Sequence, residues 1–269
     1  MEFPKTLIKR NGYIERIKPF MRKNIAKVLT GQRRVGKSFL LYQLMDQLLV
    51  EEPDANIIYI NFEDFAFSHI QTAEDMHAYI MSKFRKEKYN YIFVDEIQEI
   101  VNFERVIRSL LLNENNDIYI TGSNAKMLSG ELATYLSGRY IEFSVYSLSY
   151  LEFLAFHKLE NNNESLYLYS RYGGLPYLIN LPLKDETVNE YLKSVYSTIV
   201  FRDVVSRYNL RNSSFLEKLV QFLSENIGNL FSAKNISDYL KSQHSTISVN
   251  QIQNYTEYLN NAFLIHRVG

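Results

Sequence analysis

Hydrophobic positions along the first half of the chain follow two alternating spacings. Short runs of consecutive apolar residues predict buried strands, and apolar residues three or four positions apart predict helices. Strands are expected over residues 26–29, 57–62, 91–94, 118–121 and 140–145. Helices are expected between them, over residues 39–49, 72–85, 103–112 and 125–136. Strands that alternate with helices predict an α/β domain with a mostly parallel sheet.

The pattern changes after residue 146, where the apolar runs typical of strands almost disappear. Helical spacing predicts helices over residues 148–156, 166–172 and 188–208. A Gly-Gly-Leu-Pro cluster at residues 173–176 predicts a turn between two of them. These features predict a small helical domain that follows the α/β part of the chain.

The last part of the chain combines helices with one strand-like segment. Helices are expected over residues 215–226, 232–242 and 249–259, and alternation over residues 263–268 predicts a strand. This order is typical of a winged helix-turn-helix, in which we expect a second wing strand to be cut off. The predicted domains are an α/β core over 1–146, a helical lid over 147–210 and a winged helix-like domain over 211–269.

Composition narrows the class of protein without identifying it. Of the 269 residues, 46% are hydrophobic and 22% charged, which argues against disorder. The absence of cysteine excludes disulfides and thiolate metal sites. No apolar run reaches the roughly 18 residues of a transmembrane helix, and the N-terminus has no apolar signal core. We expect a soluble, cytoplasmic protein with no membrane partner.

Residues 31–38 read Gly-Gln-Arg-Arg-Val-Gly-Lys-Ser and match the phosphate-loop pattern G-x-x-x-x-G-K-[ST] in full. The glycines let backbone N–H groups surround phosphate oxygens, Lys37 reaches the β- and γ-phosphates, and Ser38 offers a hydroxyl to Mg²⁺. The residues expected to bind ATP are Gly31, Gln32, Arg33, Arg34, Val35, Gly36, Lys37, Ser38 and Phe39. The alternative is a glycine turn that binds nothing. For Arg33 and Arg34, contact with phosphate or a partner and simple solvation both stay open.

Two acids, Asp95 and Glu96, follow the apolar run at residues 91–94. At the carboxyl end of a buried strand they would emerge beside the phosphate loop. We expect Asp95 to hold Mg²⁺ and Glu96 to activate the attacking water. One predicted strand separates the loop from these acids in sequence, which indicates the additional-strand class of P-loop ATPases. The alternative is a strand that ends in two solvated acids.

Polar residues also flank the last two predicted strands of the core. Ser123 and Asn124 follow one strand, where either could hydrogen-bond the γ-phosphate or the attacking water as a sensor. Both residues also favour a helix N-cap, and the two roles are compatible. Arg139 precedes the final strand and is expected to reach a γ-phosphate, in cis or across the interface of a homo-oligomer. The alternative is a surface arginine.

Six stretches occur in a fixed order along the chain. They are LTGQRRVGKS, YIFVDEIQ, ITGSNAKMLSGELATYLSGRY, SLSYLEFL, YGGLP and FRDVVSRYNLRN. Together they resemble the uncharacterised bacterial and archaeal AAA-type ATPases that carry a C-terminal domain of unknown function. The resemblance spans nearly the whole chain and implies an ATPase core, a helical lid and a winged helix, with a further C-terminal region absent here. It implies a nucleotide site at residues 31–38, Walker B acids at Asp95 and Glu96, a sensor at Ser123 and Asn124, and an arginine at Arg139.

These features predict an ATP- and Mg²⁺-dependent AAA-type switch, in which hydrolysis moves the lid and the winged helix. The alternative is a nucleotide-gated regulator that binds DNA or protein with negligible turnover. DNA is not favoured, because residues 213–269 contain four basic and four acidic residues and have no net charge. A protein partner is therefore expected more than DNA. A small-molecule kinase is a third possibility, against which the Asp-Glu pair and the attached winged helix argue.

Overall fold

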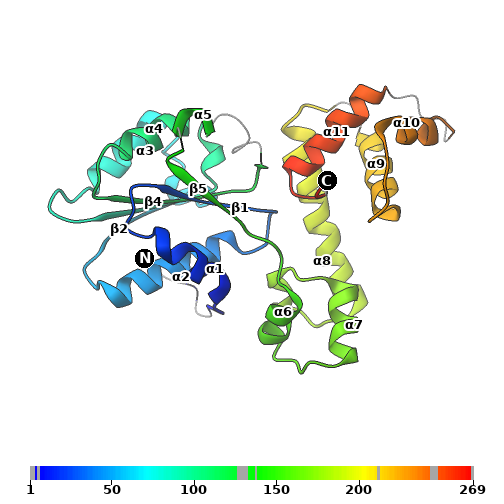
Figure 1. The fold of residues 1–269 in the computed structure, drawn as a ribbon, viewed down its shortest axis with the longest axis horizontal. Coiled ribbons are helices and arrows are strands. Elements are labelled where there is room, and N and C mark those ends of the chain that lie inside the picture. Colours follow the sequence, from blue (N-terminus) through cyan, green and yellow to red (C-terminus); the bar gives the residue numbers. More distant parts are fainter. Residues whose placement is uncertain are drawn as a thin grey trace. The chain divides into compact units, whose positions relative to one another are not determined.

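The computed structural model describes residues 4, 7–125, 133–136, 138–210, 213–242 and 248–267. The chain divides into two compact units, residues 1–190 and residues 191–269 (Figure 1). The finer division into three domains at residues 146 and 210 stays a prediction. Among the described residues, no helix combines the length and the apolar character needed to cross a bilayer.

A parallel sheet forms the centre of the first unit, as the alternating pattern predicted. Its strands have the order β2-β3-β4-β1-β5. Their bounds are Ala26–Thr30 for β1, Asn56–Asn61 for β2, Asn90–Asp95 for β3, Asn116–Gly122 for β4 and Tyr140–Ser144 for β5. Strand β4 separates β1 from β3, and all neighbouring strands run parallel. The sheet order therefore agrees with the additional-strand arrangement expected from the sequence.

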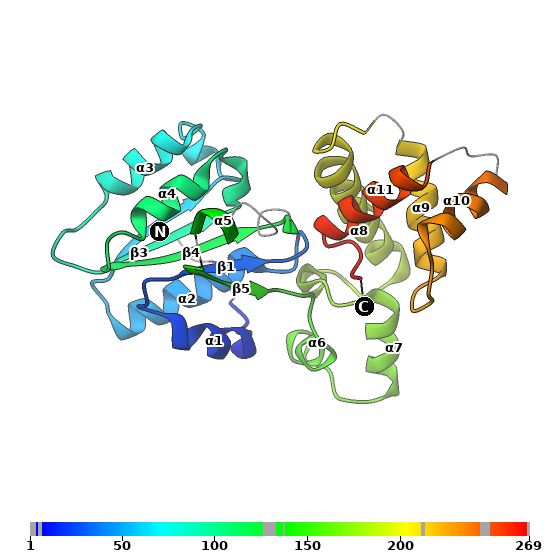
Figure 2. The same ribbon diagram turned by 45° about the horizontal axis from the view of Figure 1, so that its top comes forward.

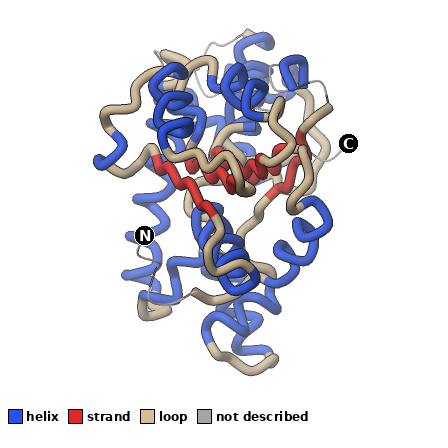
Figure 3. The backbone as a smooth tube through the Cα atoms, turned by 90° about the vertical axis from the view of Figure 1, so that its left-hand side faces the viewer, coloured by secondary structure: helices blue, strands red, loops and turns tan. Residues whose placement is uncertain are grey.

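Helices cover both faces of this sheet (Figures 1, 2 and 3). On one face lie α1 (Asn11–Ile17) and α2 (Lys37–Glu51), and on the other lie α3 (Ala73–Ser82), α4 (Phe103–Leu110) and the short α5 (Ala133–Leu136). The sequence pattern did not predict α1. It did predict a helix from residue 72, where Thr72 and Asp75 form a capping box at the start of α3. The rest of the helix predicted before α5, residues 126–132, lies outside the described residues.

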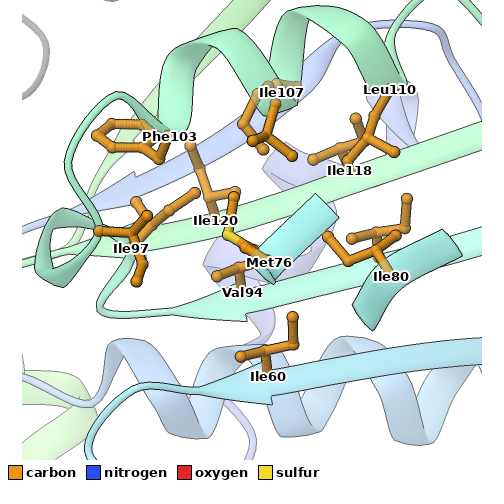
Figure 4. Close-up of a cluster of buried hydrophobic side chains, with 14 of the residues drawn as sticks. Ile60, Met76, Ile80, Val94, Ile97, Phe103, Ile107, Leu110, Ile118 and Ile120 are labelled. Atoms are coloured by element: carbon orange, nitrogen blue, oxygen red, sulfur yellow. The ribbon is translucent and has the colours of Figure 1, made fainter. Parts of the chain in front are cut away.

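Apolar side chains from strands and helices interdigitate on both sides of the sheet. In the cluster of Figure 4, Ile118 and Ile120 of β4 face Ile107 and Leu110 of α4. Every residue of β3 is buried, which is the pattern of a central parallel strand covered on both faces. At about 1.5–3 kcal/mol for each fully buried aliphatic side chain, this packing holds the carboxyl ends of the strands in fixed positions.

A charged pair is buried inside the sheet. Lys27 of β1 and Asp117 of β4 are both fully buried, and they form an ion pair. The Asp117 carboxylate also accepts hydrogen bonds from the Tyr119 hydroxyl (2.8 Å) and from the backbone N–H of Arg22 (2.7 Å). Burial lowers the pKa of Lys27, and the charge of Asp117 offsets only part of this effect. The pair links β1 and β4 near their amino ends, and the phosphate loop lies at the other end of the strands.

Helices follow the sheet in the rest of the first unit, as predicted. They are α6 (Tyr150–His157), α7 (Asn163–Tyr172) and the start of α8 (Asp185–Thr198). Side chains cap two of them, since Ser149 forms a capping box with Glu152 and Asn162 accepts from the backbone of Ser165. The α8 helix continues into a π-helical segment, Ile199–Ser206, so the long helix predicted over residues 188–208 is present with a change of winding.

Helices α9 (Ser213–Glu225), α10 (Ala233–Ser242) and α11 (Val249–Asn261) complete the second unit, with α10 and α11 in contact. The predicted strand at residues 263–268 is wrong over its described part, because residues 263–267 form no strand. Phe263 has a φ of +56°, and the N–H of Leu264 donates to the carbonyl of Leu259 at 3.0 Å. These contacts satisfy the open carbonyls at the end of α11, so the alternating residues close a helix instead of extending as a wing.

Candidate functional site

The phosphate loop connects the end of β1 to the start of α2, and two of its positions require glycine. Gly31 has a φ of +150°, and a Cβ at this residue would lie 2.1 Å from the carbonyl oxygen of Val145. Gly36 has a φ of +94° at the N-cap of α2. Side chains disfavour both conformations. The loop therefore fits closely against the end of β5 and leads into a helix N-terminus, whose free N–H groups attract anions.

Replacing Gly31 with alanine is expected to lower ATP affinity by about tenfold or more, because relieving the clash with Val145 displaces the loop backbone. Titration with a fluorescent ATP analogue measures this loss. The matched control is Gly12→Ala in α1, where an added Cβ meets no atom within 4 Å. Equal affinities of the two variants for the analogue would contradict the tight fit of the loop.

Lys37 is the first residue of α2 and lies between the loop and an acid. Its Nζ donates to the carbonyls of Gly31 (3.1 Å) and Gln32 (3.2 Å). The same Nζ lies 3.5 Å from Oε1 of Glu96, and both side chains are buried. The structure thus brings together two residues that are distant in sequence and that were both predicted for the site.

Asp95 ends β3 and is held by hydroxyl groups. The Thr121 hydroxyl donates to Asp95 Oδ1, and Ser38 forms a hydrogen bond with the same carboxyl group. Burial raises the pKa of Asp95, an effect that these two hydrogen bonds offset only in part. A serine hydroxyl beside a carboxylate supplies hard oxygen donors, which Mg²⁺ prefers. The residues present therefore fit the ion that the sequence predicted.

Glu96 follows directly, in the left-handed region with a φ of +54°. Its backbone N–H donates to Thr121 Oγ1 (2.9 Å), and its Oε2 accepts hydrogen bonds from Ser123 Oγ (2.9 Å) and Gln98 Nε2 (2.5 Å). Burial alone would raise the pKa of Glu96, but the charge of Lys37 and these hydrogen bonds outweigh burial and lower it. The result is a fixed carboxylate that is ionised at neutral pH and able to accept a proton.

The other predicted residues differ in how close they lie to this centre. Ser123 contacts Glu96 directly, and Asn124 is buried at the next position. Arg33 is buried, and its Nη1 lies 2.6 Å from Oε1 of Glu63, so simple solvation does not describe it. Arg34 and Phe39 are exposed. At least these two of the nine predicted loop residues therefore lie outside the buried part of the candidate site.

Arg139 lies at the amino ends of the strands, opposite the end where the phosphate loop lies. Its carbonyl accepts a hydrogen bond from the N–H of Ala26, the first residue of β1, whereas the phosphate loop follows the last. Five strand residues separate the two ends by about 16 Å. This distance does not fit a contact with the γ-phosphate in cis. A contact across a subunit interface and a surface arginine are the alternatives that are left.

Arg10 was not predicted, although it contacts the phosphate loop. Its buried guanidinium donates to the carbonyls of Val35 (3.1 Å) and Tyr146 (3.0 Å). It also forms a double hydrogen bond with the carboxylate of Glu152 in α6, at 2.8 and 3.0 Å. One side chain therefore connects the loop to the segment that leads into α6. The sequence around Arg10 carries no signal of this role, because Val35 and Glu152 are 25 and 142 residues away.

The Gly-Gly-Leu-Pro turn packs back towards the same loop. The carbonyl of Gly174 accepts from the N–H of Leu148 at 2.7 Å, and a Cβ on Gly174 would lie 2.3 Å from the carbonyl oxygen of Leu148. Cγ of Pro176 lies 3.7 Å from the position of a Cβ at Gly36. The turn predicted at residues 173–176 thus places a proline beside the phosphate loop.

The parallel sheet with β4 between β1 and β3, and the glycine loop at its edge, define the class as AAA-type P-loop proteins. Residues 23–154 match the family model of an AAA domain, and residues 163–269 match that of a domain of unknown function (DUF8612). An uncharacterized protein of Haemophilus influenzae is 36% identical over 270 residues, covering 98% of this chain and 67% of that protein. The chain belongs to this family of uncharacterised bacterial and archaeal proteins, in which an AAA domain precedes a domain of unknown function.

One further relative and one solved structure are also similar to the chain. The uncharacterized protein MJ1544 of Methanocaldococcus jannaschii is 32% identical over 257 residues, and the match covers 90% of this chain and 56% of that protein. The structure of the Aeropyrum pernix ORC1 protein in complex with DNA has a TM-score of 0.45 and 12% identity. That likeness covers 96% of this chain and 85% of the ORC1 chain. The family assignment rests on the sequence matches and not on this structural likeness.

Proposed function

We propose that the protein binds ATP together with Mg²⁺ and hydrolyses it. The observation that supports this proposal is the meeting of three segments at the carboxyl edge of the sheet, with Lys37 from α2, Asp95 and Glu96 after β3, and Ser123 after β4. Lys37 and the backbone N–H groups of the loop bind the phosphates. Ser38 and Asp95 would hold Mg²⁺, which neutralises charge on the phosphates when bound.

Hydrolysis needs a water that attacks the γ-phosphorus while its bond to the β–γ bridging oxygen breaks. In this proposal Glu96 accepts the proton of that water, and the leaving oxygen becomes part of ADP. The hydrogen bonds that Ser123 and Gln98 donate to Glu96 Oε2 fix the direction of the carboxylate. Ser123 thereby acts next to the γ-phosphate, in line with a sensor role. Asn124 is proposed for the same role at the neighbouring position.

We further propose that nucleotide state moves the helices that follow the core. Arg10 connects the loop carbonyl of Val35 to Glu152 of α6, and Pro176 lies beside Gly36. A change in the loop on phosphate binding would therefore act directly on residues 147–210 as a lid. Residues 211–269 follow along the chain as the proposed output region, with a protein partner favoured over DNA. A homo-oligomer would let Arg139 reach the site of a neighbouring copy.

The test of hydrolysis is the replacement of Glu96 by glutamine. Glu96→Gln keeps the hydrogen-bonding shape of the side chain but removes the proton acceptor, so ATP binding should persist while turnover falls by about 100-fold or more. Steady-state phosphate release and an ATP titration measure the two effects. Glu99→Gln, on the same turn but exposed, is the matched control and should retain turnover.

Undiminished phosphate release by Glu96→Gln would contradict the role of Glu96 as the base. A wild-type protein that binds ATP and releases no phosphate would instead favour a nucleotide-gated regulator without turnover.

A further inference from the structure

Gln98 lies on the 3₁₀ turn Ile97–Glu99, directly after the two acids, and no role follows for it from the phosphate-loop motif. Its Nε2 donates to Glu96 Oε2 at 2.5 Å and to Ser123 Oγ at 3.3 Å. Ser123 Oγ in turn donates to the same Glu96 oxygen at 2.9 Å. The three side chains form a closed triangle of hydrogen bonds around one carboxylate oxygen.

The other end of the Gln98 amide is its oxygen, Oε1. This oxygen is buried, and no hydrogen-bond donor within the described part of the chain reaches it. A buried acceptor without a donor costs about 1–3 kcal/mol, so such atoms are normally satisfied by water or a ligand. The orientation of the amide is fixed by chemistry, because only its NH₂ end can donate to the carboxylate of Glu96. The oxygen end is therefore open to a donor that is not among the described residues.

Water is the donor that fits this position. The phosphates of ATP and the carboxylate of Glu96 are acceptors, so neither can satisfy Oε1. Oε1 shares its amide carbon with Nε2 and therefore lies within about 5 Å of Glu96 Oε2, a gap that one water with two hydrogen bonds of about 2.8 Å spans. Such a water gives one hydrogen to each oxygen and leaves a lone pair free to attack.

We propose that Gln98 is a catalytic residue whose carbonyl oxygen accepts a hydrogen bond from the attacking water. This inference rests on the proposed hydrolysis of ATP. The water donates one hydrogen to Gln98 Oε1 and loses the other as a proton to Glu96. Its oxygen forms the new bond to the γ-phosphorus as the bond to the bridging oxygen breaks and ADP takes the electron pair. The amide nitrogen of Gln98 meanwhile holds Glu96, so one side chain orients both base and nucleophile.

The test compares Gln98→Met, which keeps the size of the side chain and removes both polar ends, with the wild-type protein. Single-turnover hydrolysis of ATP should slow by about 100-fold, whereas the ATP dissociation constant and the thermal unfolding midpoint should stay close to wild type. A merely structural role would instead lower affinity and the unfolding midpoint along with the rate. The matched control is Gln47→Met on α2, where the amide also donates to a carboxylate, Glu51 Oε1, at 3.0 Å.

A second variant keeps the test decisive if Gln98→Met unfolds. Gln98→Glu retains an acceptor oxygen but places a second negative charge beside Glu96, and should also slow hydrolysis without loss of the fold. Wild-type rates in Gln98→Met or in folded Gln98→Glu would overturn the role of Gln98 while leaving the proposed function intact. Absence of hydrolysis by the wild-type protein would overturn both proposals together.

Discussion

Lys37→Ala is expected to lower the affinity for ATP by about 1,000-fold, the largest effect of any single change at the site. The ammonium is buried and already donates to the carbonyls of Gly31 and Gln32, so it is positioned before phosphate arrives. Hydrogen bonds to charged groups contribute about 1.5–3 kcal/mol each, and two such bonds to phosphate account for a loss of this size.

Isothermal titration with ATP and Mg²⁺ measures this change. Lys83→Ala, an exposed lysine at the end of α3, is the control and should bind as the wild type does. The unfolding midpoint of Lys37→Ala shows whether the fold survives. Binding of ATP by a folded Lys37→Ala protein within threefold of wild type would contradict the assignment of the loop.

Asp117→Asn is expected to destabilise the protein by about 3–5 kcal/mol, because the charge of Lys27 is then buried without its partner. Asparagine can still accept hydrogen bonds from Tyr119 and from the backbone of Arg22 through its one oxygen. Its amide nitrogen then faces the Lys27 ammonium, so the loss combines the missing charge with a missing acceptor. Chemical denaturation measures the free energy of unfolding. The control is Asp54→Asn, which breaks an exposed ion pair with Lys88 and should change stability very little.

The double variant Lys27→Met with Asp117→Asn makes this prediction sharper. Removing the buried charge altogether should recover part of the stability that Asp117→Asn loses. A double variant less stable than Asp117→Asn would show instead that the side chain of Lys27 stabilises the sheet by itself.

The local parts of the site could be predicted from sequence. The loop from Gly31 to Ser38 is continuous in the chain, and its glycines follow from the conformation that a phosphate cradle needs. Asp95 and Glu96 end an apolar run, and the parallel sheet brings that end beside the loop. Ser123 could be placed in the same way, as the polar residue at the end of the next strand. In each case one short, continuous stretch of sequence was enough to predict the residue's place in the site.

Residues whose roles depend on distant partners could not be predicted. Lys27 sits in a short apolar run, and its partner Asp117 is 90 residues away. Arg10 is one of many charged residues near the N-terminus until the fold brings Val35 and Glu152 to it. Thr121 was assigned only to a strand, although its hydroxyl connects Asp95 to the backbone of Glu96.

The errors have physical causes as well. Alternation over residues 263–268 resembles a strand, but a strand needs a partner to satisfy its backbone, and the backbone here bonds to the end of α11 instead. Arg139 stays a prediction for a contact across a subunit interface; it precedes a strand parallel to β1, so it lies at the end of the strands opposite the loop, and only the contact in cis does not fit.

Single-turnover conversion of ATP by the wild-type protein tests the nucleotide site most directly. Protein in excess over radiolabelled ATP is mixed with Mg²⁺, and bound nucleotide is separated over time. We expect bound ATP to become ADP and phosphate in the presence of Mg²⁺ and to stay intact when the metal is chelated. Recovery of unchanged ATP from the protein–Mg²⁺ mixture, or failure to retain ATP at all, would contradict the assignment of Lys37, Asp95 and Glu96 to an ATP-hydrolysing site.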